Sequence, residues 1–133
     1  MNEGYNEVLR SIGSSDPTPG GGSVAALSLA HAHSLAMMVA RLTDGKEKWS
    51  EGHEVAKSVI SESQVGLAEA MRLAEIDAEA FESVMSAYRL PRETEEEKEI
   101  RKKSIRDATI GAAEAPLATA STYHTAARTT ARP

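Results

Sequence analysis

The sequence contains no cysteine, and it has one tryptophan and one phenylalanine among its 133 residues. The absence of cysteine excludes a disulfide framework, a thiolate metal site and a cysteine nucleophile. Aromatic residues make up only 4% of the chain, so aliphatic side chains and alanine must supply most of the core. A chain of this length is expected to form one domain with a single core.

Basic residues are also scarce relative to acidic ones, and the formal net charge is −5. This balance argues against non-specific nucleic-acid binding, so no nucleic-acid partner is expected. An anionic ligand would need a local basic patch. Five residues at two predicted helix ends are candidates for such a patch: Arg41, Lys46, Lys48, Arg89 and Arg92.

A leader peptide and a membrane span are not expected either. The first residues, MNEGYNEVLRSIGS, lack the basic and then apolar pattern of a signal peptide. Residues 23–42 approach the length of a bilayer span, but they include three serines, two histidines and an arginine, and much of the rest is alanine. We therefore expect a cytoplasmic protein with a buried apolar helix and no membrane partner.

The apolar residues recur with helical spacing throughout, and no stretch alternates as a strand does. Four helices are expected: Glu3–Ile12, a helix from an N-cap at Ser23 to about Thr43 before a stop at Gly45, Glu51–Tyr88, and a helix opened by a Thr94–Glu97 capping box. The third would be about 55 Å long. The predicted fold class is therefore all-α, an elongated helical bundle with long antiparallel helices.

The last part of the chain differs from the rest. Pro116 is expected to kink or end the fourth helix. From Thr119 onward the sequence is rich in threonine, with little aliphatic content and no apolar stripe. We therefore predict a helical domain over residues 1–118 and a frayed or disordered tail over residues 119–133.

The three consecutive glycines before the second helix form the first candidate site. Gly20, Gly21 and Gly22, with Ser23, leave the first amides of a helix free, and the helix dipole adds to them. Such an arrangement can bind an anion or a carbonyl oxygen. A flexible hinge is the alternative, and residue type alone does not decide between the two. The spacing fits neither a P-loop nor a dinucleotide fingerprint, because no strand precedes it.

Asp77 is the strongest single candidate for a catalytic residue, because it falls on an apolar stripe of the third predicted helix. The other members of that stripe are Ala70, Leu73, Ala74, Phe81, Val84 and Tyr88. A carboxylate on such a face is costly unless it is paired or performs chemistry. Two interpretations stay open: a buried aspartate satisfied by a serine, tyrosine or arginine, and a general acid and base.

The other polar candidates are weaker. Lys46, just after the Gly45 stop, either meets a carboxylate ligand or is a solvated loop charge. His31 and His33 are two residues apart on a helix and point to nearly opposite sides, so they cannot chelate one ion. His53 and His124 have no partner at a ligand spacing. No metal site is predicted.

Four segments in collinear order resemble the cyclodeaminase/cyclohydrolase family. They are PTPGGGSVAAL, LTDGK, DAEAFESVMSAYRLPRETEEEKEIRKKSI and AAEAPLATA. The resemblance covers roughly residues 3–120. The Pro-x-Pro-Gly-Gly-Gly-Ser and Asp-Ala-x-Ala-Phe motifs are specific in that order and separation. The family is an all-helical domain found alone in microbes and fused to a formiminotransferase in animals.

The resemblance implies folate one-carbon chemistry. A cyclodeaminase converts 5-formimino-tetrahydrofolate into 5,10-methenyl-tetrahydrofolate and ammonia, and some relatives are methenyl-tetrahydrofolate cyclohydrolases. It also implies a homodimer, with no metal and no cofactor beyond the tetrahydrofolate itself. Asp77 would be the catalytic proton donor and acceptor. The residues expected to bind the folate and its glutamate tail are Gly20, Gly21, Gly22, Ser23 and Lys46.

The chain departs from this family after the Ala-Pro-Leu segment. Relatives continue through further helices there, whereas this sequence has a threonine- and arginine-rich stretch, so we expect a C-terminally shortened member. Two functions therefore stay open. Asp77 and the glycine loop favour a folate enzyme, and the missing helices favour a helical dimerisation or binding module that has lost turnover.

Overall fold

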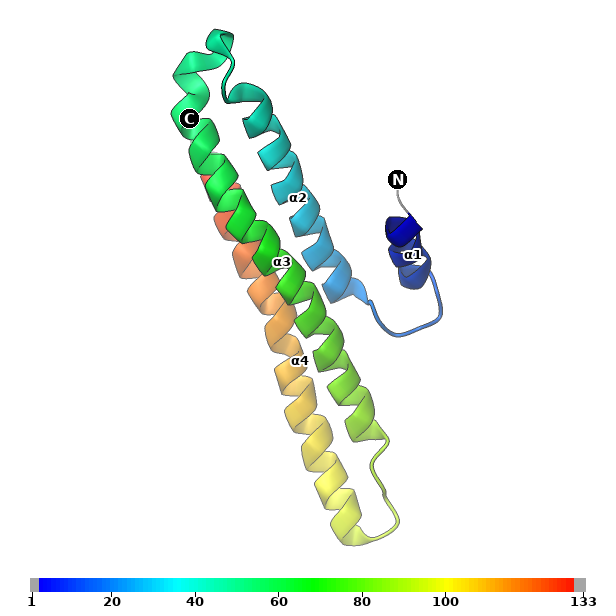
Figure 1. The fold of residues 1–133 in the computed structure, drawn as a ribbon. Coiled ribbons are helices and arrows are strands. Elements are labelled where there is room, and N and C mark those ends of the chain that lie inside the picture. Colours follow the sequence, from blue (N-terminus) through cyan, green and yellow to red (C-terminus); the bar gives the residue numbers. More distant parts are fainter. Residues whose placement is uncertain (1–2, 131–133) are drawn as a thin grey trace.

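The structure, a computed structural model, describes residues 3–130 of the chain, with side chains over residues 3–124. It consists of α1 (Glu3–Ile12), α2 (Gly21–Thr43), the short 3₁₀ helix η1 (Glu47–Gly52), α3 (His53–Tyr88) and α4 (Glu95–Thr130), with no strand among the described residues. The predicted all-α, elongated bundle is confirmed. Figure 1 shows α3 packed against α2 along one part of its length and against the antiparallel α4 along most of it.

Local capping signals place several helix ends correctly. The Glu97 N–H donates to Thr94 Oγ1 at 3.1 Å, and the Thr94 N–H donates to Glu97 Oε2 at 3.0 Å, so the predicted capping box is confirmed. The C-cap of α2 is Asp44, and the next residue, Gly45, has a φ of 77°. This left-handed conformation suits glycine, and it confirms the predicted stop.

Two helix starts differ from the prediction. The N-cap of α2 is Gly20, not Ser23, and the helix begins at Gly21. Ser23 lies inside the first turn, because its hydroxyl bonds to α3 instead of capping its own helix. α3 begins at His53, two residues later than expected, since the residues before it form η1.

α4 also corrects the prediction for the end of the chain. It runs through Pro116 to Thr130, so the proline does not end the helix and residues 119–130 of the predicted tail are helical. Ala115 and Thr119 lie one turn apart and are only 4% and 3% exposed. Burial of this face offsets the helix bond that proline removes. Residues 131–133 of the predicted tail lie outside the described residues.

Small residues line the contact between α2 and α3. Ala26 packs with Leu73 and Ala74, and one turn further along Leu29 packs with Ala70. Ala26 and Ala70 are completely buried. Side chains of this size let two helix backbones approach closely, which explains why α2 is so rich in alanine.

His33 and Gly66 continue the same contact. A Cβ added to Gly66 would lie 2.7 Å from Nδ1 of His33 and closer still to other ring atoms, so the imidazole occupies the space that a side chain would need. Nε2 of His33 is buried without a hydrogen-bond partner within the described part of the chain. Burial lowers the pKa of His33 below its usual 6.5, which favours the neutral ring in this contact.

The opposite face of α2 is exposed and still apolar. Its large side chains, Leu35, Met38, Val39 and Leu42, are 49–59% exposed. α1 lies apart from the bundle (Figure 1) and buries no residue of its own. The hydroxyl of Tyr5 lies 3.2 Å from Nε2 of His31, so α1 touches α2 at this side.

α2 also has the length and composition of a membrane span, the only helix within residues 3–130 that does. A third of its most apolar stretch, 33%, is buried inside the bundle. Core helices of soluble proteins pass the same test, and the packing of α2 on α3 fits the core helix that the sequence predicts.

The close contact at Gly66 predicts opposite effects for two glycine-to-alanine variants. Gly66→Ala should destabilise the fold by about 1–3 kcal/mol, because the new methyl group overpacks against His33. Gly111→Ala in α4 meets nothing within 4 Å and should stabilise the fold by about 0.5–1 kcal/mol through helix propensity. Urea unfolding measures both. Equal stabilisation by the two variants would show that α2 and α3 are not in tight contact at Gly66.

Candidate functional site

α2 starts beside the middle of α3, and this junction brings two of the predicted features together. A Cβ added to Gly22 would lie 2.7 Å from Oδ2 of Asp77 and closer still to the rest of the carboxylate. Only glycine therefore fits at this position. One of the three glycines is thus explained by contact with Asp77, within the protein itself.

Ser23 links the same two helices by hydrogen bonds. Its hydroxyl lies 3.0 Å from Oδ2 of Asp77 and 3.1 Å from the carbonyl oxygen of Ala74, and it can donate to either. The residue is 2% exposed. The expected partner of Asp77, a serine, is confirmed, but Asp77 is half-buried and not buried as that interpretation supposed. These contacts leave a catalytic role open.

The first turn of α2 supplies free backbone donors beside this carboxylate. The first intrahelical bond runs from the Val24 N–H to the Gly20 carbonyl at 3.0 Å, so the amides of Gly21, Gly22 and Ser23 have no acceptor within the helix. A Cβ on Gly21 would meet nothing within 4 Å. The junction therefore combines a carboxylate with the positive end of a helix dipole, and it is open at Gly21.

An aromatic residue lies next along α3. Phe81 follows Asp77 by one turn and is 39% exposed. Its place on the stripe of Asp77 indicates an apolar surface next to the carboxylate. Phe81 is the only phenylalanine of the chain, and it was expected on this stripe from its helical spacing.

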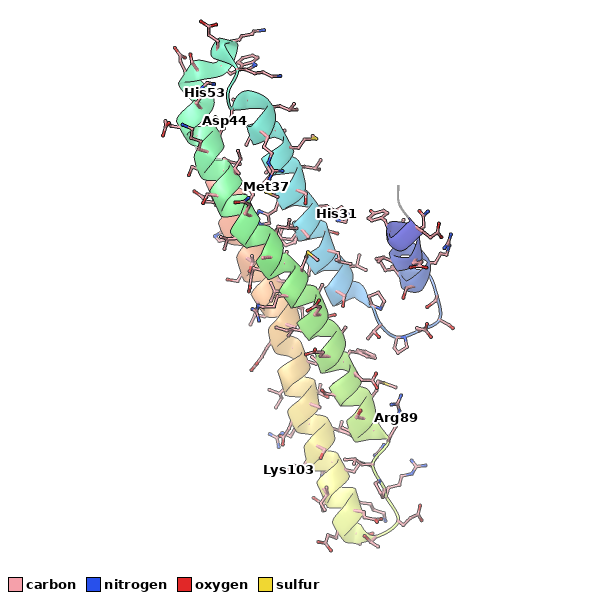
Figure 2. All side chains as sticks on the ribbon, in the orientation of Figure 1. His31, Met37, Asp44, His53, Arg89 and Lys103 are labelled. Atoms are coloured by element: carbon pink, nitrogen blue, oxygen red, sulfur yellow. The ribbon has the colours of Figure 1, made fainter. Side chains whose placement is uncertain are left out.

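The structure does not bring Lys46 to this junction. Lys46 follows the opposite end of α2, about 35 Å away along a helix of 23 residues. Figure 2 shows Asp44 and His53, which flank Lys46 in the chain, at that far end. Lys46 is exposed, and its carbonyl oxygen lies 2.9 Å from both the Trp49 amide and Nε2 of His53. Within one chain, Lys46 and Asp77 cannot contact one small ligand.

The histidines lie as their spacing predicts. His33 faces α3, whereas His31 is exposed and bonds to the Leu27 carbonyl through Nδ1 at 2.6 Å. Among the described residues, no group of three or more histidine, aspartate or glutamate side chains is placed to hold a metal ion. The prediction that the protein needs no metal and no separate cofactor stays a prediction.

The sequence and fold match known proteins over nearly the whole chain. A model of the formiminotransferase-cyclodeaminase family matches residues 4–132. A methenyltetrahydrofolate cyclohydrolase of Methylorubrum extorquens is 42% identical over 118 residues, which cover 88% of this chain and 56% of that protein. The formimidoyltransferase-cyclodeaminase of Sus scrofa is 33% identical over 114 residues, which cover 86% of this chain and 21% of that protein.

The crystal structure of a formiminotetrahydrofolate cyclodeaminase from Thermotoga maritima superposes with a TM-score of 0.73 at 26% identity. The match covers 97% of this chain and 59% of that one. This chain therefore spans little more than half the length of the bacterial relatives and about a fifth of the animal one. By the family match and these identities, the chain belongs to the formiminotransferase-cyclodeaminase family.

Proposed function

We propose that this chain acts on a tetrahydrofolate derivative in one-carbon metabolism, at the carbon that bridges two folate nitrogens. The observation that carries the proposal is the junction of Asp77 with the free amides of α2. A proton donor and acceptor lies there beside groups that bind a carbonyl or an anion. The names of the family relatives, all folate enzymes, point to the same substrate class.

Two reactions at that carbon remain. In the cyclodeaminase reaction, a folate nitrogen attacks the formimino carbon, a carbon–nitrogen bond breaks and ammonia leaves after accepting a proton. In the cyclohydrolase reaction, water adds to the methenyl carbon and loses a proton, and one ring carbon–nitrogen bond breaks to leave a formyl group. Both need one group that accepts a proton and returns it to the departing nitrogen, and Asp77 takes this role in either case.

The 42% identity to a cyclohydrolase favours hydrolysis over the cyclodeaminase reaction that the sequence analysis put first. The cyclodeaminase reaction stays the second candidate, because the solved relative with the same fold is named for it. A helical binding module without turnover is the third.

Asp77→Asn should abolish turnover and retain the fold, because an amide cannot accept and return the proton. An absorbance assay on the wild-type chain follows methenyl-tetrahydrofolate, which disappears in hydrolysis and appears from 5-formimino-tetrahydrofolate in deamination. Glu79→Gln is the matched control, since Glu79 is an exposed carboxylate of the same helix. Full activity in the Asp77 variant would remove Asp77 from the mechanism. If the wild-type chain converts neither methenyl-tetrahydrofolate nor 5-formimino-tetrahydrofolate, the remaining candidate is the binding module without turnover.

Two neighbouring glycines should fail in different ways. Gly21→Val leaves the fold intact, because a side chain there meets nothing within 4 Å, but it blocks the open side of the helix start and should weaken folate binding by about tenfold or more. Gly22→Ala drives a methyl group into the Asp77 carboxylate and should reduce both stability and turnover. Thermal unfolding and folate titration separate the effects. Unaltered folate affinity in the Gly21 variant would favour the alternative interpretation, in which the glycine loop is only a flexible hinge.

We also propose a cytoplasmic homodimer that pairs the exposed faces of α2. The apolar stripe runs from Val24 to Leu42, and residues 24–40 carry no formal charge apart from histidine. An antiparallel pairing about the helix centre would set Val24 opposite Leu42 of the partner subunit. It would also set Gly20 opposite Lys46 of the partner subunit. Lys46 would then reach the folate tail across the interface, which it cannot do within its own chain.

Cysteine cross-linking tests this pairing cleanly, because the chain has no cysteine of its own. The double variant Val24→Cys and Leu42→Cys should form a covalent dimer on oxidation. Each single variant should stay uncross-linked, since its two copies would lie about 27 Å apart along the antiparallel helices. Cross-linking of the single variants would indicate a parallel pairing. A monomer in sedimentation at every concentration tested would overturn the dimer.

A further inference from the structure

Ser23 differs from the other serines of α2 in where its hydroxyl bonds. Ser28 and Ser34 donate to carbonyl oxygens one turn back in their own helix, at 2.8 and 3.0 Å. This is the usual arrangement for a serine in a helix. The hydroxyl of Ser23 instead reaches two oxygens of α3, the Ala74 carbonyl and Oδ2 of Asp77. It is also the most buried of the three.

A serine hydroxyl has one hydrogen to donate and two lone pairs that accept. With two acceptors within 3.1 Å, that hydrogen has two positions. While Asp77 is ionised, the hydroxyl donates to Oδ2. When Oδ2 carries a proton, that proton is donated to the oxygen of Ser23, and the serine hydrogen turns to the Ala74 carbonyl.

We propose that Ser23 is a positioning residue whose hydroxyl follows the protonation of Asp77 during turnover. This inference rests on the proposed function, in which Asp77 takes up and returns a proton. Rotation of one hydroxyl hydrogen then keeps the carboxyl group hydrogen-bonded in both states. A buried polar group that lost its partner in one state would make that state costly.

This assignment replaces the sequence-based one for Ser23. Ser23 was expected to bind the folate together with the glycines, but it is 2% exposed and its hydroxyl is directed at α3. The folate is left to the neighbouring glycines, whose amides precede the first intrahelical bond. The side chain of Ser23 therefore acts on the reaction through Asp77, without touching the substrate.

Kinetics separate a positioning role from a binding role. In whichever folate reaction the wild type performs, Ser23→Ala should lower kcat by about 10- to 100-fold and change KM by less than about twofold. Ser23→Thr keeps the hydroxyl and should recover most of the loss. Ser63→Ala is the matched control, a 5% exposed serine of α3 about 20 Å from Asp77, and it should affect stability alone.

Three outcomes overturn the proposal. A raised KM with unchanged kcat in Ser23→Ala would mean that Ser23 contacts the folate. Unchanged kcat and KM in Ser23→Ala would mean that the hydrogen bonds of Ser23 serve only the packing of the two helices. Failure of the threonine variant to recover activity, with its fold intact by circular dichroism, would show that the hydroxyl is not what matters.

A second readout needs no turnover, so it distinguishes failure of this inference from failure of the proposed function. Carbon-13 NMR follows the carboxyl carbon of Asp77, assigned with Asp77→Asn, and Cβ of Ser23 as the pH is lowered. If the serine hydroxyl follows the carboxyl group, both signals move with one midpoint. A Ser23 signal that stays constant while Asp77 titrates would overturn the inference, even in a chain that proves inactive.

Discussion

The close contact of α2 with α3 is the constraint on which the rest of the structure depends. Two helices approach closely where small residues lie at their contact, and here Gly66, Ala70 and Ala74 supply such positions on α3 between Gly66 and Asp77. The same closeness creates the candidate site. Because Gly22, the second residue of α2, lies against Asp77, the free amides of the first turn lie beside a carboxylate contributed by another helix. The packing of the two helices and the proposed chemistry therefore depend on the same contact.

A carboxylate between two packed helices needs hydrogen-bond partners, and in the proposed mechanism it must also remain able to react. Oδ2 of Asp77 accepts a hydrogen bond from the hydroxyl of Ser23, and the positive end of the α2 dipole lies close by. Both are electrostatically favourable contacts for a carboxylate. The structural and the catalytic interpretations of Asp77 are thus compatible. The serine supplies a hydrogen-bond partner at this half-buried position.

The sequence predicts well those features that depend on nearby residues. The Thr94–Glu97 capping box, the glycine stop at Gly45 and the end of α3 at Tyr88 are all local, and all are confirmed. Ser23 has the chemistry of an N-cap, yet its hydroxyl finds acceptors more than 50 residues away. Pro116 has the chemistry of a helix stop, yet burial of its neighbours carries the helix on. Both errors are tertiary contacts overriding local preference.

The site shows the same division. Periodicity singled out Asp77, and composition singled out the glycines, but neither gives the register that sets Gly22 against Asp77. The position of Lys46 just after the helix stop likewise does not predict that it lies at the opposite end of α2 from the junction.

The two faces of α2 differ in what covers them within one chain: one face packs on α3, and the other is exposed. Its small residues face α3, and Leu35, Met38, Val39 and Leu42 face outward. Leaving a large aliphatic side chain in water forgoes about 1.5–3 kcal/mol of burial. Several of them in one continuous stripe, on a helix uncharged over residues 24–40 apart from histidine, make an exposed surface that a stable fold seldom leaves open. The stripe is therefore the surface that the proposed homodimer would bury, and the site at the start of α2 lies at its edge.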